Sequence, residues 1–213
     1  FTIALAMSLV PAISESFAIS DWTEINKRCT IGLKLTLFIG LPAAVGIMIL
    51  ANPIIKLLYR NMESAEAMAT GNLLSMLSIG VIFLTLIQSL TAMLQGVGKV
   101  AIPVRNLGIG AAFKIILTTI LVGIPSINIK GAAIGTLACY GVAAILDFAA
   151  VLKYTRMEFS ISEFIIKPVI ATTVMGVGVF FSYRFSYIRL DSNTNATLLS
   201  IIAGIILYII MVF

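Results

Sequence analysis

The sequence contains no histidine and few charged residues, so most side chains used in polar catalysis are missing. Charged residues make up 11% of its 213 residues, whereas a soluble domain typically carries about 25%. Without histidine the chain lacks the commonest metal ligand and the commonest general base. The two cysteines, Cys29 and Cys139, lie far apart in or beside apolar runs, so no disulfide framework or metal-ligand spacing is present. The sequence therefore predicts no catalytic residue, no metal site and no cofactor.

The basic residues do not form a patch. Lysine and arginine total 14 against 9 acidic residues, which gives a net charge of +5. Because these basic residues are scattered between apolar runs, they do not create the one-sided positive surface that nucleic acid requires. We therefore expect no nucleic-acid partner.

Long apolar runs dominate what is present. Hydrophobic residues make up 60% of the chain and its mean hydropathy is +1.12. Seven runs have the length, roughly 17 to 25 residues, that crosses the hydrocarbon core of a membrane as a helix. They do not alternate with a period of two and are too long for barrel strands. The sequence predicts an all-α, polytopic transmembrane bundle with helices at about 1–18, 32–58, 71–95, 104–124, 131–152, 164–184 and 196–213. Both ends of the chain are expected to be cut inside membrane helices.

Gly96-Val97-Gly98-Lys99 superficially resembles a phosphate-binding loop. A loop of the GxxxxGK[ST] type would need glycine in place of Met93, serine or threonine in place of Val100, and a strand before it. All three are missing. Glycines after one apolar run and Pro103 at the start of the next are instead typical of helix ends. Gly96, Gly98, Lys99 and Pro103 are therefore predicted to turn the chain at the membrane surface.

The distribution of lysine and arginine predicts which side of the membrane this turn faces. Assigning alternate loops to opposite sides gives eight basic residues on one side and five on the other, and the richer side is expected to be cytoplasmic. The turn at Lys99 belongs to the richer side. The eight are Lys27, Arg28, Lys34, Lys99, Arg105, Lys153, Arg156 and Lys167, and the five are Lys56, Arg60, Lys130, Arg184 and Arg189.

Four phrases, in order along the chain, resemble one family of transporters. They are "ALAMSLVPAISESFA", "GLPAAVGIMILANPIIKLLY", "TAMLQGVGKVAIPVRN" and "FKIILTTILVGIPSINIKGAAIGTLACYGVAAIL". Together they resemble the stage V sporulation protein B-like, polysaccharide-biosynthesis branch of the MOP (multidrug/oligosaccharidyl-lipid/polysaccharide) flippase superfamily, which is MATE-like. The resemblance implies a multi-pass protein of the bacterial inner membrane, with about fourteen helices in two six-helix lobes and a terminal pair. Residues 1–155 would form most of the second lobe, and 156–213 the terminal helix pair.

The same resemblance implies a substrate and a mechanism. Members of this kind carry undecaprenyl pyrophosphate-linked sugar precursors, including the peptidoglycan precursor lipid II, across the membrane by alternating access. In related lipid II flippases the charged motif for substrate handling lies in the first lobe, upstream of the segment that matches "ALAMSLVP", so that site cannot be transferred to this chain.

Two charged residues inside apolar runs are candidates for the substrate pathway. Lys114 lies near the middle of its run and Asp147 about five residues from the end of the next, and a charge at such a depth costs about 2.5 to 3.5 kcal/mol. Three interpretations remain open. The two residues form a neutralising pair or snorkel separately; or Lys114 meets a pyrophosphate; or Asp147 binds a coupling cation or proton.

Other polar and helix-bending residues complete the candidates. Thr85, Gln88 and Thr91 are spaced by three residues and share one helical face, which either lines a wet pathway or bonds helix to helix. Pro42 lies inside an apolar run and removes a backbone donor, so a kink or hinge is expected there.

Three classes of function remain to be weighed. The first is a flippase of lipid-linked precursor, whose partners would be that precursor, membrane lipids and a coupling cation. The second is a Na⁺- or H⁺-coupled multidrug efflux antiporter of the same fold. A cavity for an anionic pyrophosphate should be net positive, whereas a cavity for cationic drugs should hold uncompensated carboxylates. The third, a membrane enzyme or a non-transporting assembly subunit, has little support because histidine and paired acids are missing.

Overall fold

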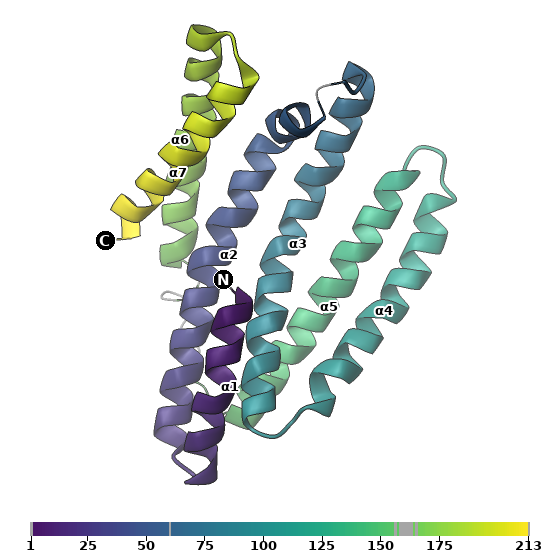
Figure 1. Cartoon of the computed structure of the whole chain (residues 1–213). Helices are drawn as coiled ribbons and strands as arrows, with labels where there is room; N and C mark the ends of the chain where they lie inside the picture. Colours follow the sequence, from purple (N-terminus) through teal and green to yellow (C-terminus); the bar gives the residue numbers. More distant parts are fainter. Residues whose placement is uncertain (1, 60, 156, 158–163, 165, 213) are drawn as a thin grey trace. The chain divides into compact units, whose positions relative to one another are not determined.

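The computed structural model describes residues 2–59, 61–155, 157, 164 and 166–212. Within these residues all regular structure is helical, and seven α-helices follow one another along the chain (Figure 1). The all-α prediction is confirmed. The helices are α1 (Thr2–Ala18), α2 (Trp22–Leu58), α3 (Ser64–Gly96), α4 (Ala101–Val122), α5 (Ile129–Thr155), α6 (Lys167–Leu190) and α7 (Asn193–Val212).

Six of these helices are long and apolar enough to cross a membrane, namely α2 to α7. The first helix, α1, is apolar too but has 17 residues in the described part of the chain. Helices of this length and composition satisfy their own backbone hydrogen bonds, which is the requirement that lipid imposes. The chain is therefore that of a multi-pass membrane protein.

Several helices extend beyond the apolar runs that predicted them, most clearly α2. It begins at Trp22 instead of residue 32, because Asp21 caps it: the Asp21 carboxylate accepts a hydrogen bond from the backbone N–H of Glu24, at 3.0 Å. The polar residues that follow are helical as well. Hydropathy thus locates the part of a helix that lies in lipid, while the cap determines where the helix starts.

The chain divides into two compact units, and α2 and α3 contribute to both. Unit 1 comprises residues 1–40 and 82–164, and unit 2 comprises 41–81 and 165–213. The expected division at residues 155 and 156 concerns a lobe and a terminal pair in a longer protein, and Arg156 is not among the described residues. Arg60, used in the charge comparison, is not among them either.

Unit 1 contains α1, the first part of α2, the last part of α3, and the antiparallel hairpin of α4 and α5. The α1 helix is tied to α2 by Arg28, whose Nη1 donates to the carbonyl oxygen of Ala12 at 2.7 Å and whose Nε donates to Glu24 at 3.0 Å. Its core combines side chains from α1, α2, α3 and α5, including Ile13, Leu33, Met93 and Val151.

Unit 2 contains the rest of α2 and α3 together with the α6–α7 hairpin. Asn193, at the first residue of α7, accepts a hydrogen bond from the Tyr183 hydroxyl at 2.9 Å and donates one to the carbonyl oxygen of Pro53 at 3.0 Å. A small core of Leu50, Met175 and Val179 joins α2 to α6. These contacts hold the α6–α7 hairpin against α2.

Candidate functional site

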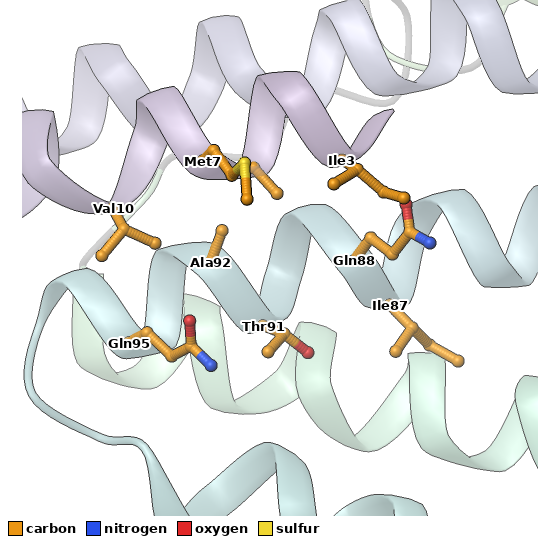
Figure 2. Close-up of a pocket in the computed structure, with 9 residues that line it drawn as sticks. Ile3, Met7, Val10, Ile87, Gln88, Thr91, Ala92 and Gln95 are labelled. Atoms are coloured by element: carbon orange, nitrogen blue, oxygen red, sulfur yellow. The ribbon is translucent and has the colours of Figure 1, made fainter. Parts of the chain in front are cut away.

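A groove of about 310 Å³ lies between α1 and α3 in unit 1 (Figure 2). The polar side of the groove is a row on α3 formed by Gln88, Thr91 and Gln95. These positions are three and four residues apart, so they fall on one face of the helix. The remaining lining is apolar and consists of Ile3, Ala6, Met7, Val10, Ile87 and Ala92.

The groove offers hydrogen bonds without charge. No acidic or basic side chain is among its lining residues, while two amides and one hydroxyl are. The Oε1 of Gln88 is buried and has no hydrogen-bond partner within the described chain. A buried acceptor without a partner costs about 1 to 3 kcal/mol, and a ligand that donates a hydrogen bond relieves this cost once the Gln88 side chain turns its oxygen toward the groove.

Thr85 does not share this groove, although it lies three residues before Gln88. Its hydroxyl donates to the carbonyl oxygen of Ile82 at 2.9 Å, and its side chain lies against Gly40 of α2, where an added Cβ would collide with it. Thr85 therefore packs α3 against α2. Gln95, which the sequence reading did not single out, joins the row instead because seven residues are close to two helical turns.

A second polar contact joins α4 to α5. The Asn106 amide donates a hydrogen bond to Oδ1 of Asp147 at 2.8 Å, and the two residues are only 2% and 1% exposed. The other carboxylate oxygen, Oδ2, has no hydrogen-bond partner among the described residues. One carboxylate oxygen of Asp147 thus has a hydrogen-bond partner and the other has none within the described chain, and the side chain is enclosed between two helices.

Lys114 and Asp147 do not pair. Among the described residues no ion pair involves Lys114, and its side chain is exposed. The reason is the register of the antiparallel hairpin: Asn106 lies opposite Asp147, and Lys114 follows Asn106 by about 12 Å along the axis, at ~1.5 Å per residue. The carbonyl oxygen of Lys114 faces Gly135 instead, where an added Cβ would lie 3.2 Å away.

Glycines set this register by allowing close approach. A Cβ added to Gly110 of α4 would lie 2.5 Å from the carbonyl oxygen of Cys139 in α5. Small residues let helices in membranes approach to backbone contact. The backbone approach, and not charge attraction, therefore decides which polar side chains of α4 and α5 meet.

The turn between α3 and α4 has the geometry expected of its glycines. Gly98 adopts a left-handed φ of +73°, its N–H donates to the carbonyl oxygen of Gln95 at 2.9 Å, and the N–H of Lys99 donates to that of Leu94 at 2.8 Å. This is a Schellman motif, which ends a helix without side-chain caps. Pro103 is buried in the first turn of α4.

The structure also shows where two other predicted residues, Gly96 and Pro42, lie. Gly96 is the last residue of α3 and lies against α1, where an added Cβ would be 2.7 Å from Ile13. Pro42 lies within α2, which remains helical through it, two residues after the boundary between the units at Gly40. A kink or hinge at Pro42 remains a prediction, as does the cytoplasmic side of the Gly98 turn.

Asn106 and Gln95 are the residues that reading the sequence missed. Asn106 lies at the start of the predicted helix 104–124, three residues after Pro103, and its spacing alone does not mark it as a partner of Asp147. The sequence did contain one signal: Asn106 lies in the first two turns of its helix, and the following helix carries Asp147 near its end. Among the described residues no group of three metal-binding side chains is present.

Comparison with known proteins places the chain in a family. The family model described as lipid II flippase MurJ matches residues 1–212. The MurJ family belongs to the MOP superfamily, so the expected superfamily is confirmed.

Two curated relatives and one solved structure resemble the chain. The lipid II flippase MurJ of Bacillus subtilis (strain 168) is 25% identical over 211 residues, which cover 94% of this chain and 37% of that protein. The uncharacterized membrane protein YabM of the same organism is 32% identical over 147 residues, covering 69% of this chain and 26% of that protein. A structure of lipid II flippase MurJ in an inward closed conformation superposes with a TM-score of 0.70 at 22% identity, covering 100% of this chain and 42% of that one. The chain thus spans less than half the length of each.

Proposed function

The chain belongs to the lipid II flippase MurJ family, and we propose that it is part of a transporter of lipid-linked peptidoglycan precursor in the bacterial inner membrane. The family consists of flippase transporters and not of enzymes. We propose that the precursor is a lipid II-like undecaprenyl pyrophosphate carrying sugars, and that it moves by alternating access. Residues 1–155 would supply most of the second six-helix lobe, and 156–213 the terminal pair.

The α1–α3 groove is the observation that supports this proposal best. The head group of a lipid-linked sugar presents many hydroxyl and amide N–H donors. The row of Gln88, Thr91 and Gln95 offers matching uncharged partners in an otherwise apolar groove, and the Oε1 of Gln88 lacks a partner within the described chain. Polar groups that fix a ligand in a mostly apolar cavity are typical of small-molecule sites.

Lys114 is proposed to meet the pyrophosphate. Its side chain is exposed, has no ion pair within the described chain, and lies about 20 Å along α4 from Ala101, at ~1.5 Å per residue. An ammonium serves as a point charge for phosphate and tolerates several geometries. A lysine without a counter-ion at this depth is costly in lipid, and an anionic substrate would offset that cost.

The exact substrate and the coupling ion are also part of the proposal. The stage V sporulation protein B-like branch would carry other undecaprenyl-linked oligosaccharides through the same groove, because its polar groups recognise hydroxyls in general. The rival function is an efflux antiporter coupled to Na⁺ or H⁺. The free Oδ2 of Asp147 favours a coupling cation there, but the α1–α3 groove has no carboxylate to attract a cationic drug.

The test is translocation of fluorescent lipid II by the full-length protein in proteoliposomes. Lys114→Met is expected to reduce translocation by about ten- to a hundredfold, the equivalent of losing a charge-assisted contact of about 1.5 to 3 kcal/mol, while Lys114→Arg retains much of the activity. Lys130→Met, at the start of α5, is the matched control and should translocate normally.

Each outcome separates the candidates. Normal translocation by Lys114→Met would remove the lysine from the pathway. Efflux of a cationic dye without any lipid II translocation would favour the antiporter. Retention of translocation for other undecaprenyl-linked sugars, with little for lipid II, would favour the polysaccharide branch.

A further inference from the structure

Two lysines approach one aromatic ring at an end of the α4–α5 hairpin. The Nζ of Lys99, in the turn before α4, lies 5.2 Å from the centre of the Tyr154 ring, and the Nζ of Lys153, on α5, lies 5.6 Å from it. Both distances are within the range of cation–π attraction. The two lysines are 54 positions apart in the sequence, so the fold brings their charges together.

The ring that gathers these charges is held in place. Tyr154 is half-buried and packs against the core of unit 1, while the two lysine side chains are exposed. Like charges around one ring repel each other, and no carboxylate forms an ion pair with either lysine in the described part of the chain. Glu15 and Glu24 are engaged instead with Arg28. Among the residues that the structure describes, the two lysines therefore have no counter-ion.

The position of the ring in the fold indicates where the counter-ion would come from. Lys99 follows the last turn of α3 and Lys153 belongs to the last turn of α5, so both lie at ends of membrane-spanning helices. Lysine and tyrosine at helix ends lie at the level of the lipid head groups. Clustered basic side chains at that level attract anionic lipids.

We propose that Lys99, Lys153 and Tyr154 form a site for the phosphodiester of an anionic phospholipid. The two ammonium groups bind the phosphate oxygens, and the Tyr154 ring attracts both of them, at 5.2 and 5.6 Å from its centre. Phosphatidylcholine has the same phosphate but adds a cation beside it, so it binds more weakly. This site is separate from the α1–α3 groove, and it does not depend on the transported substrate.

The experiment is native mass spectrometry of the full-length protein in detergent, with phosphatidylglycerol or phosphatidylcholine of the same acyl chains added. The double variant Lys99→Gln/Lys153→Gln is expected to bind phosphatidylglycerol about thirtyfold more weakly, since each lysine contributes about fivefold. Its affinity for phosphatidylcholine should barely change. The control Lys56→Gln/Lys130→Gln removes the same charge at two other helix ends and should bind phosphatidylglycerol normally.

Two more arms test the geometry and the source of the phosphate. Tyr154→Leu keeps both charges but removes the ring, and a several-fold loss of phosphatidylglycerol binding is expected. Inorganic phosphate should not displace the lipid at equal concentration. A thermal-unfolding midpoint that is unchanged in all variants rules out a loss through misfolding.

Three results would overturn the site. Equal losses in the double variant and its control would mean diffuse charge attraction. Unchanged binding of phosphatidylglycerol by Tyr154→Leu would mean that the Tyr154 ring does not contribute to the site. Displacement by inorganic phosphate would mean that the ligand is a soluble anion and not a lipid. None of these readouts uses lipid II, so each is independent of the translocation test.

Discussion

The groove between α1 and α3 presents uncharged polar side chains to an open space, whereas the contact between α4 and α5 encloses a carboxylate between two helices. In the groove, Gln88, Thr91 and Gln95 face about 310 Å³ of free volume. In the contact, Asn106 and Asp147 are almost completely buried, and Gly110 brings the helices to backbone distance. Polar groups around free volume can exchange partners with a ligand, but enclosed ones mainly hold helices together. The following changes test that distinction.

The largest effect is expected from removing the partner of the enclosed carboxylate. Asn106→Leu leaves Asp147 without any hydrogen bond, which should destabilise the protein by about 3 kcal/mol. The double change Asn106→Leu/Asp147→Leu should recover part of this loss, because no buried polar group then remains unpaired. Thermal unfolding in detergent measures both. Purely additive losses would show that the two residues act independently.

Widening the helix contact should have the next largest effect. Gly110→Ala places a methyl group 2.5 Å from the carbonyl oxygen of Cys139, so α4 and α5 must separate, at a cost of about 1 to 3 kcal/mol. Gly108→Ala is the matched control, since nothing lies within 4 Å of its added Cβ. It should be neutral or stabilising by up to about 1 kcal/mol, because alanine favours the helix. Equal effects of the two changes would show that α4 and α5 do not approach closely.

A polar change in the groove should affect stability less and function more. Gln88→Leu removes a buried oxygen that has no partner, so the free energy of unfolding should stay the same or rise by about 1 kcal/mol. Lipid II translocation by the same variant should fall. Thr85→Val, on the same helix but outside the groove, should translocate normally. A stability loss for Gln88→Leu with normal translocation would make the groove a packing defect.

The smallest loss of stability is expected at Lys114. Its exposed ammonium has no ion pair within the described chain, so Lys114→Met removes no partner and should leave the free energy of unfolding unchanged or raise it, since an unpaired charge in lipid is costly. The unfolding midpoint of this variant, measured beside Asn106→Leu, shows which of the two polar residues of α4 supports the fold. A large loss for Lys114→Met would mean that the lysine has a structural partner.

Much of the fold could be predicted from the sequence because its signals are local. The seven apolar runs each correspond to one helix, and the glycines of "GVGK" end α3 in the predicted turn. The ends of the helices were predicted less well. Residues 22–31 are helical although most of them are polar, since the cap at Asp21 and the hydrogen bonds of Arg28 extend α2 beyond its apolar run.

The candidate site was predicted only in part, because spacing along one helix does not reveal what lies opposite. Gln88 and Thr91 share the groove as their spacing indicated, but Thr85 turns to α2 and Gln95 takes its place. Asp147 is 1% exposed because it is enclosed between α4 and α5, which its position in an apolar run did not show. The partner of Asp147 is Asn106 and not Lys114. These two residues of α4 lie about two helical turns apart, and counting residues from the ends of an apolar run does not resolve such a difference.

The sequence by itself determined that this chain crosses a membrane as helices. Apolar length and the need to satisfy each backbone group in lipid are properties of each segment alone. Only the tertiary structure decided that Asn106 meets Asp147, that Lys99 and Lys153 share the ring of Tyr154, and that α1 leaves a groove beside Gln88. These outcomes depend on the rotation and register of neighbouring helices. Register is set by contacts such as Gly110 against the backbone of Cys139, between residues that are distant in the sequence.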